Sequence, residues 1–480
     1  MARTTRWGRG AALGVGVLLS ATALAQDAHY NTRQFGDRAW LLGGAFVGGP
    51  DDISAVYYNP GALGLLTAPE LELTGSVYEY TRVTVVDGLG SGRNLGLSDV
   101  SAVPSLIAGS FRFDFLGKSQ LAYSLLTRQG FSYSMETRGV HAGTDLAGVT
   151  GMNALSTDVQ LDQSVHEYWA GLSWALPVSK RLGVGLSPFL AFREQELSVQ
   201  VLAEGSGDAG QRLLATLGRD VQLRHIRLLL KLGASYQQAP WAVGLTVTTP
   251  SVGLWGQGST GYERSIVTPG FDTGSAPASV FNFQDGLRGH FRNPWSAALG
   301  VSRTFSRSTV HLSVEGFARL APFTLVDSAP FVPLDSSEVI DPDFDVALAP
   351  VVNVALGLEQ RLGAKVRGYL SGHTDFSALA NTPGANASLA GWDLYHASTG
   401  FHFLVGRSRF TLGTDVAWGG KRTDRLSDAL QQAGVSAPEQ SHQIRYFQAT
   451  VVIGISLSFI DKRETGGEVG AGDDSDAEAK

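Results

Sequence analysis

The chain has 480 residues, of which 43% are hydrophobic and 17% charged, and it contains 59 glycines and no cysteine. Because glycine weakens helix interiors, this composition disfavours a largely helical fold. The net charge of -7 argues against nucleic acid as a partner, since proteins that bind a phosphate backbone need a cationic surface. The lack of cysteine excludes disulfide scaffolds, thiolate metal sites and cysteine nucleophiles.

Residues 1–25 have the features of a secretory signal peptide. Three arginines precede an apolar run, and Ala23-Leu24-Ala25 supplies the small residues that signal peptidase accepts. The apolar run is too short to cross a bilayer as a helix. We therefore predict cleavage after Ala25 and export of the mature chain from the cytoplasm.

Hydrophobic and polar residues alternate through most of the remaining chain. Near the C-terminal end, for example, Phe447, Val451 and Ile455 share one parity while polar or small residues occupy most of the other. This period of two is typical of strands with one apolar face. It predicts fourteen strands, at residues 70–83, 104–115, 119–129, 158–177, 181–202, 220–237, 240–249, 286–303, 308–318, 347–361, 364–374, 391–405, 408–419 and 443–459.

The connections between these strands alternate between tight turns and long loops. The long connections are expected at residues 130–157, 203–219, 250–285, 319–346, 375–390 and 420–442. Such alternation is typical of outer-membrane barrels, which must close because lipid cannot satisfy an open sheet edge. We predict an all-β fold, a fourteen-stranded antiparallel transmembrane β-barrel over residues 70–460, in the bacterial outer membrane. A secreted β-sandwich is the alternative, because its strands also alternate.

Residues 26–69 precede the barrel and lack its alternation. They contain a glycine-rich stretch with Asp51 and Asp52, followed by Asn59-Pro60-Gly61. Residues 35–63 resemble the N-terminal hatch of the FadL/TodX family of long-chain fatty acid and hydrocarbon transporters. In that family the form G-x-A-x-x-x-x-x-D-D-x-S-A-x-x-x-N-P-A precedes the first strand, and Gly61 departs from its final Ala. The resemblance implies a hatch that plugs the barrel lumen, with Asp51, Asp52, Asn59, Pro60 and Gly61 as its seating or gating residues.

The resemblance also implies transport of a hydrophobic compound. The ligand would be captured by extracellular loops, held in the lumen and released after the hatch shifts. A ligand carboxylate would need a luminal arginine or lysine as its partner. Strand parity directs eight candidates inward: Arg112, Arg193, Arg227, Lys231, Arg288, His290, Arg292 and Arg367. The other interpretation is that these side chains form ion pairs with Asp114, Glu315, Glu359 and Asp415 of the strands, or with Asp37, Asp51 and Asp52 of the hatch.

The predicted loops offer a possible capture surface. Residues 250–285 are rich in apolar side chains, among them Leu254, Trp255, Phe271, Phe281 and Phe283. These side chains either pack on one another as a lid or contact the hydrophobic ligand. Leucine spacing further predicts short amphipathic helices at 211–218 and 424–433.

Enzyme and cofactor signatures are weak. Residues 205–210 satisfy G-x-G-x-x-G, but they lie between two predicted strands and lack a parallel βαβ unit, so we interpret them as a flexible loop. We expect neither catalysis nor a cofactor or metal. A lipid hydrolase with a Ser–His pair formed in space is one alternative function. A non-transporting barrel that acts as a scaffold or partner of a surface or secretion complex is another.

The C-terminal end suggests two further features. Phe459 ends the last predicted strand and is expected to be read by the outer-membrane assembly machinery. Residues 461–480 carry seven acids and three bases, which predicts an acidic, disordered periplasmic tail. Besides the assembly machinery, the expected partners are a hydrophobic small molecule, the lipid bilayer and lipopolysaccharide, and the protein is expected to be a monomer.

Overall fold

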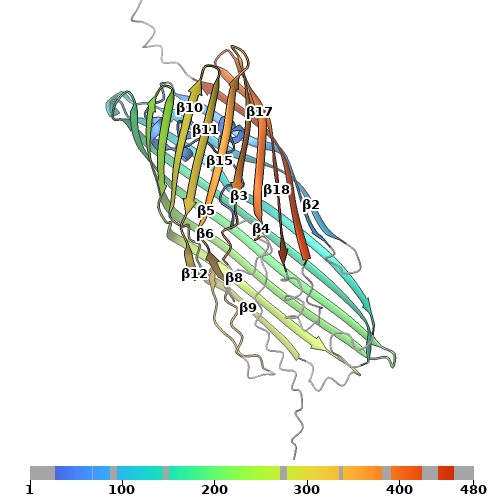
Figure 1. The fold of residues 1–480 in the computed structure, drawn as a ribbon. Coiled ribbons are helices and arrows are strands. Elements are labelled where there is room, and N and C mark those ends of the chain that lie inside the picture. Colours follow the sequence, from blue (N-terminus) through green and yellow to red (C-terminus); the bar gives the residue numbers. More distant parts are fainter. Residues whose placement is uncertain are drawn as a thin grey trace, which may run out of the picture.

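The computed structural model describes residues 28–67, 69–86, 94–143, 151–270, 278–334, 339–380, 391–423 and 442–458. Most of these residues form one antiparallel sheet, which closes because the first strand, β1, pairs with both β2 and β19. Figure 1 shows the resulting barrel with a short helical segment inside one end. No helix in the described part of the chain is both long and apolar enough to cross a membrane.

Fourteen strands form the closed ring. They are β1 (Glu70–Val86), β2 (Leu95–Phe111), β3 (Gln120–Ala142), β4 (Met152–Pro177), β5 (Leu182–Gly207), β6 (Arg212–Gln238), β7 (Trp241–Thr248), β10 (Ser296–Phe305), β11 (Ser308–Phe317), β15 (Val351–Arg361), β16 (Val366–Asp375), β17 (Asp393–Val405), β18 (Ser408–Thr423) and β19 (His442–Ser458). Each overlaps one of the fourteen predicted strands, so the predicted fold class and strand number are confirmed. The short connections between these strands gather at one end of the ring, the turn end, which is uppermost in Figure 1.

At the opposite end, the loop end, further strands extend the wall. β8 (Val252–Val267) pairs with the loop-end part of β6, and β9 (Ala278–Gly289) pairs with β8. β13 (Val326–Asp327) adds to β9, while β12 (Leu320–Thr324) and β14 (Asp345–Leu348) pair with each other. The barrel is therefore asymmetric, since the wall from β3 to β9 is much longer than the wall from β10 to β19 (Figure 1).

Several predicted loops are strands in the structure. The connection between β5 and β6 is reduced to residues 208–211, so the flexible loop expected at 205–210 and the helix expected at 211–218 are wrong. The leucines at 213 and 217 share one face in a strand as well as in a helix, and cross-strand pairing decides between the two. The loop expected at 250–285 is largely the β8–β9 hairpin, and the strand expected at 286–303 is interrupted at residues 290–295, where Pro294 offers no N–H. The helix expected at 424–433 lies outside the described residues.

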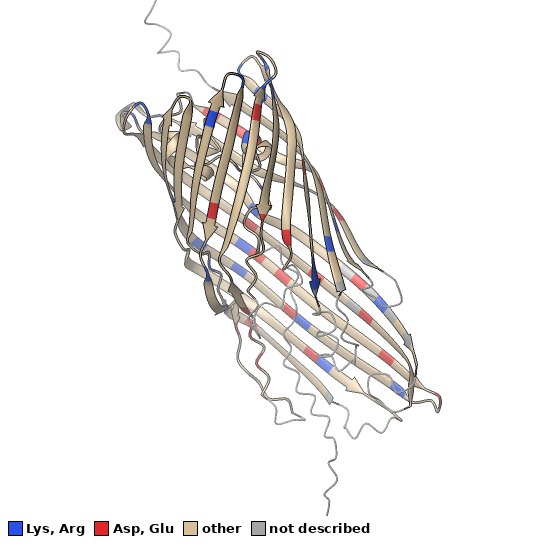
Figure 2. Cartoon of the chain, viewed as in Figure 1, with Lys and Arg blue, Asp and Glu red and all other residues tan. Residues whose placement is uncertain are grey.

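The outer face carries a band of exposed apolar side chains. On β5 this face shows Val184, Leu190 and Phe192, and the next outward residue is Glu194. Phe192 is paired with Tyr168 of β4 and with Ile226 of β6, so the band ends at the same height on all three strands. In Figure 2 the turn half of the wall is mostly uncharged, whereas charges gather on the long strands of the loop half. An apolar belt bounded in this way is what a bilayer requires of a barrel.

Among the described residues, short α-helices are confined to the segment before β1. They are α1 (Asp37–Leu41), α2 (Ala55–Tyr58) and α3 (Pro60–Leu63), and a 3-10 turn, η2 (Asp114–Leu116), lies between β2 and β3. Nearly every described side chain from 28 to 66 is buried. We call residues 28–67 the luminal segment.

Candidate ligand site in the barrel lumen

The luminal segment crosses the barrel from wall to wall near the turn end. α1 packs against β1 and β16 to β19, whereas α3 packs against β4, β5 and β6 on the other side. Residues 28–34 continue along β16 and β17 toward the loop end, where Asp375 accepts hydrogen bonds from the backbone N–H groups of Tyr30 and Asn31. The predicted location of this segment in the lumen agrees with these contacts. Its boundaries and its role as a movable hatch remain predictions.

Asn59 fixes the α3 side of the luminal segment. Its side-chain oxygen accepts a hydrogen bond from the N–H of Gly61 at 3.1 Å and so caps α3. Its Nδ2 donates to the carbonyl of Val47 at 3.1 Å and to that of Ala234 at 3.0 Å. One side chain therefore joins two turns of the segment to strand β6.

Glycine allows the backbone of α3 to touch the wall. A Cβ on Gly61 would lie 2.7 Å from the carbonyl oxygens of Gly183 and Gly233. On the neighbouring strand β7, a Cβ on Gly244 would lie 1.9 Å from the carbonyl oxygen of Val47. The departure from Ala at position 61 thus has a steric reason, because this wall leaves no room for a methyl group there.

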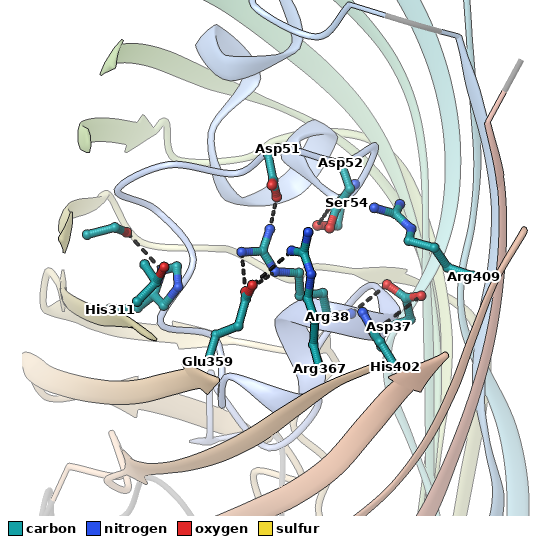
Figure 3. Close-up of polar contacts among 12 residues, drawn as sticks. Asp37, Arg38, Asp51, Asp52, Ser54, His311, Glu359, Arg367, His402 and Arg409 are labelled. Atoms are coloured by element: carbon teal, nitrogen blue, oxygen red, sulfur yellow. Dashed lines mark hydrogen bonds and ion pairs between the residues drawn. The ribbon is translucent and has the colours of Figure 1, made fainter. Parts of the chain in front are cut away.

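Charged side chains hold the α1 side instead. Arg38 donates through Nε to Glu359 at 2.7 Å and also contacts Asp51, while Arg367 reaches the other oxygen of Glu359 at 2.8 Å (Figure 3). Burial would lower the pKa of Arg38, but the Glu359 carboxylate holds it above the ordinary value. Arg367 and Glu359 thus form one of the ion pairs that the second interpretation of the luminal cations allows, whereas Asp51 contacts Arg38, which is not one of the eight candidates.

Four carboxylates, those of Asp37, Asp52, Glu70 and Glu72, gather at α1, and Arg409 lies among them. Asp37 accepts a hydrogen bond from Thr411 at 2.9 Å, and Glu72 accepts one from the N–H of Asp37 at 2.6 Å. Burial alone would raise the pKa of Asp37, but His402 and Arg409 hold it below the ordinary value. Asp52 accepts hydrogen bonds from the N–H and hydroxyl of Ser54, and burial raises the pKa of its carboxyl. Figure 3 shows Asp37, Asp52, His402 and Arg409 of this group.

A second charged cluster lies on the wall formed by β4, β5 and β6. Arg193 and Arg227 are fully buried, and both pair with Glu167, at 2.9 and 2.6 Å. Their guanidinium groups lie 3.8 and 4.8 Å from the ring centre of Phe291, and the ammonium of Lys231 lies 3.8 Å from that of Tyr57. Three cations thus face a single carboxylate among these side chains. A buried excess of positive charge is a favourable place for an anionic group.

An apolar cluster continues from this point toward the loop end. Its buried members come from the inner wall, from the chain between β11 and β15 and from the start of the luminal segment; they include Leu197, Leu223, Phe323, Val326, Phe344, Trp392 and Tyr446. Phe291 belongs to this cluster and also underlies Arg193 and Arg227. The lumen therefore contains an apolar region that ends at a cationic one, an arrangement suited to a molecule with a long apolar part and a polar head.

Comparisons with known proteins bear on the fold. The sequence matches no family profile and no curated protein. A solved structure of a Pseudomonas aeruginosa FadL homologue has a TM-score of 0.57 at 10% identity, covering 90% of this chain and 100% of that one. The Pseudomonas putida toluene transporter TodX gives 0.55 at 13% identity, covering 88% and 98%, and the Ralstonia pickettii toluene transporter TbuX gives 0.55 at 14%, covering 90% and 100%. The chain has a FadL/TodX-like fold.

In this FadL/TodX-like barrel the other predicted site residues are dispersed. Arg112 lies at the turn end and donates to Gln120 at 3.2 Å and to the backbone after α3. Arg292 is exposed near the ring of Phe323, and Arg288 and His290 are exposed as well. Leu254, Trp255, Phe281 and Phe283 are exposed on β8 and β9, whereas Phe271 lies outside the described residues. Nothing is described of the Asp114 side chain. The roles of all these residues remain predictions.

Three important side chains were absent from the sequence prediction. Glu167 and Trp169 share the inward parity of β4, and Trp169 donates to Glu167 at 2.6 Å, so parity could have identified both. Arg38 precedes the hatch motif, and no periodic signal marks it. Its partner Glu359 is 321 positions away in the chain.

One group of described side chains lies close enough to hold a metal ion: His373, His396 and Asp415. His396 contacts Asp415 at 3.1 Å, and the two imidazole rings stack with centroids 4.1 Å apart and an interplanar angle of 16°. Lone pairs of stacked rings lie in nearly parallel planes and do not converge on one point. As arranged, the group serves as a hydrogen-bonded support for the segment, since His373 also contacts the carbonyl of Asn31 at 3.1 Å.

The wall of the barrel has a seam between β2 and β3. Within the described residues these strands pair only through Leu106–Phe111, although β2 stays paired with β1 as far as Leu95 and β3 with β4 as far as Ala142. On the loop-end side of the paired part, Leu97 packs against Phe131, Tyr133 and Val165. Apolar side-chain contacts take the place of backbone hydrogen bonds between the two strands here.

Proposed function

We propose that the protein carries hydrophobic molecules, long-chain fatty acids or similar compounds, inward across the bacterial outer membrane. The observation that carries this proposal is the buried apolar cluster that ends at Arg193 and Arg227 over Phe291. An enclosed apolar region lowers the free energy of a long apolar solute that leaves water, and a cationic end orients its head. The similar solved structures, those of a FadL homologue and of toluene transporters, support the same cargo class.

The proposed route begins at the loop end. Cargo is captured there, enters the apolar cluster, places its carboxylate at Arg193 and Arg227, and leaves sideways through the seam between β2 and β3 into the membrane. The luminal segment acts as the hatch. A described cavity beside it, lined by residues such as Gln34, Tyr57 and Asn353, measures about 30 Å³, which leaves room for water alone. Passage of cargo therefore requires movement of the luminal segment or of the parts of the chain that pack on its loop-end side.

A disulfide across the seam tests the route. A Cβ on Gly130 would lie 3.9 Å from Cγ1 of Val103, within reach of a cysteine pair, and the chain has no other cysteine. In a strain without the native gene, Val103→Cys/Gly130→Cys should take up radiolabelled palmitate at background level when oxidised and recover when reduced. The matched control Ala108→Cys/Ser124→Cys bridges the same strands where they are already paired, and it should transport in both states. Equal uptake by the oxidised seam variant would contradict the lateral exit.

Removal of one buried arginine tests the cargo class. Arg227→Gln leaves Arg193 to pair with Glu167, so no carboxylate is left unpaired. We expect palmitate to bind the purified protein about tenfold more weakly, since a charge-assisted hydrogen bond contributes about 1.5–3 kcal/mol. Binding of hexadecane should not change, and the outward-facing variant Arg224→Gln should bind both ligands as the wild type does. Equal losses for both ligands would mean that Arg227 does not meet a carboxylate.

The filled lumen also fits a second function, a closed barrel that serves as a scaffold or partner of a surface or secretion complex. On that alternative, deletion of the gene would leave uptake of every hydrophobic compound unchanged and would disturb a surface complex instead. We propose that the protein is not an enzyme. Ester cleavage by purified protein that is lost after treatment with a serine-directed reagent would contradict this.

A further inference from the structure

Three exposed arginines form a group on the outer face, just beyond the apolar band, on the adjacent strands β1, β19 and β18. They are Arg82, Arg445 and Arg422. Arg445 is paired with Thr84 of β1 and with Gly420 of β18, so Arg82 and Arg422 are its diagonal neighbours on either side. Diagonal neighbours on one sheet face are about 7–8 Å apart, which lets long side chains converge on one bound group.

The burial of adjacent residues fixes the direction of these side chains. Thr81, Val83, Ile444 and Tyr446 are buried inside the barrel, so Arg82 and Arg445 must point outward. On the same outer face, the exposed ring of Phe447 lies opposite Arg82, and that of Trp418 lies opposite Phe447, two residues nearer the turn end than Arg445. Aromatic rings at this position mark the interface between a bilayer and water. The arginines therefore stand at the height of the lipid headgroups.

None of the three arginines forms an ion pair with an acid in the described part of the chain. The contact found for Arg445 is a long one, 3.4 Å, to the amide oxygen of Gln443 on its own strand. At the same height on the opposite wall, Arg224 is equally outward but is neutralised by Glu194 at 2.8 Å. Nearer the loop end of that wall, the lining of a groove of about 360 Å³ includes acids such as Glu136, Asp220 and Glu263. The outer surface is thus cationic on one side and paired or acidic on the other.

We propose that Arg82, Arg422 and Arg445 bind the phosphorylated headgroup of an outer-leaflet glycolipid. A guanidinium is well matched to phosphate because it offers several N–H donors in a planar fork. The acyl chains of such a lipid would extend from the headgroup toward the turn end, against Trp418, Phe447 and the apolar band. This continuity favours a membrane lipid over free phosphate, which would gain nothing from the apolar surface. The site is separate from the lumen and does not depend on which cargo is carried.

Titration with diphosphoryl lipid A, followed by native mass spectrometry of the full chain in detergent, tests this site. Arg82→Ser/Arg422→Ser/Arg445→Ser should bind lipid A roughly tenfold more weakly than the wild type, because water and salt weaken each of the three partly exposed charge contacts. The matched variant Arg224→Ser removes one exposed arginine from the paired wall and should bind as the wild type does. The triple lysine variant, which keeps the charge at all three positions, should retain most of the affinity.

Three results would overturn the proposal. Affinity of the serine variant within twofold of the wild type would show that the arginines do not contact lipid A. An equal loss for Arg224→Ser would show a general effect of surface charge. Competition by inorganic phosphate at the concentration of the lipid would show a site for free phosphate. Dephosphorylated lipid A provides a further check, because wild type and serine variant should bind it equally, and a difference between them would contradict recognition of phosphate.

Discussion

The two sides of the luminal segment are held to the barrel by different physics. On the α3 side, Asn59 and the glycines at 61 and 244 bring backbone against backbone, and shape determines the fit. On the α1 side, Arg38 and Asp37 are held by Glu359, Arg409 and other charged or polar groups. A close steric fit changes little with pH or ligand, whereas buried charge pairs respond to both. We therefore expect the α1 side to move first if the segment acts as a hatch, with α3 as its fixed end.

The largest expected effect is on the α1 side. Glu359→Gln removes the carboxylate shared by Arg38 and Arg367, and breaking a buried pair in this way costs about 3–5 kcal/mol. Hydrogen–deuterium exchange should show faster opening of residues around α1, while α3 keeps its protection. The outward-facing variant Glu196→Gln should exchange as the wild type does. Equal loss of protection at α3 would mean that the segment opens as one unit.

A bulkier residue tests the steric fit on the α3 side. Gly244→Ala places a methyl group against the carbonyl of Val47 and the Asn59 side chain, and overpacking of this kind typically costs about 1–3 kcal/mol. The rate of hydrogen–deuterium exchange should increase more at α3 than at α1. Gly316→Ala is the matched control, because its nearest neighbour, a methyl group of Val352, would be 3.9 Å from the added Cβ. Unchanged exchange in Gly244→Ala would show that this contact is loose.

Loss of the cap should weaken the same side by a smaller amount. Asn59→Ala removes the acceptor for Gly61 and the donors to Val47 and Ala234, and loss of such a cap typically costs about 0.5–2 kcal/mol. Asn59→Asp keeps the acceptor but not the donors, so it should separate the two roles. Single-channel conductance and uptake at wild-type levels in both variants would contradict the assignment of Asn59 to hatch seating.

The smallest expected effect depends on pH, and the substitution stabilises the luminal segment, whereas the preceding ones destabilise it. The pKa of Asp52 is raised above its ordinary 3.8 by burial, so the folded segment holds this proton more tightly than the unfolded chain does. The contribution of this proton to the stability of the folded segment is therefore largest at pH values below the ordinary pKa, and it is lost as the pH rises through the raised pKa of the folded state. Asp52→Asn keeps an oxygen for Ser54 and should stabilise the α1 side at neutral pH but not at pH values below the ordinary pKa. A variant that is less stable than the wild type at neutral pH would contradict this sign.

The sequence predicted the number and position of the strands in the barrel wall better than how far the strands extend at the loop end. Alternation of side chains placed fourteen strands correctly, because each strand in a barrel has one face to lipid and one to the interior. The same pattern failed beyond the apolar band at residues 203–219 and 250–285, whose described parts are mostly strand. There both faces carry mixed side chains, so polarity no longer distinguishes a paired strand from a loop, and cross-strand pairing decides.

The candidate site was predicted in part. Parity identified Arg193, Arg227 and Lys231 as inward residues, and the structure buries all three. It could not show that Arg193 and Arg227 share Glu167, or that Phe291 lies beneath both. The hatch motif was recognised as a string of residues, but the reason for Gly61 became visible only with Gly183 and Gly233 beside it.

The sequence by itself determined which face of each strand is apolar, the number of strands and the existence of a separate segment before them, because these are local properties of neighbouring residues. The tertiary structure decided which charges meet, where β2 and β3 lose their pairing, and how the segment divides into a side held by charge and a side held by shape. Those features join residues hundreds of positions apart, such as Arg38 and Glu359. Closure of the barrel brings such residues together, and no local pattern encodes their distance.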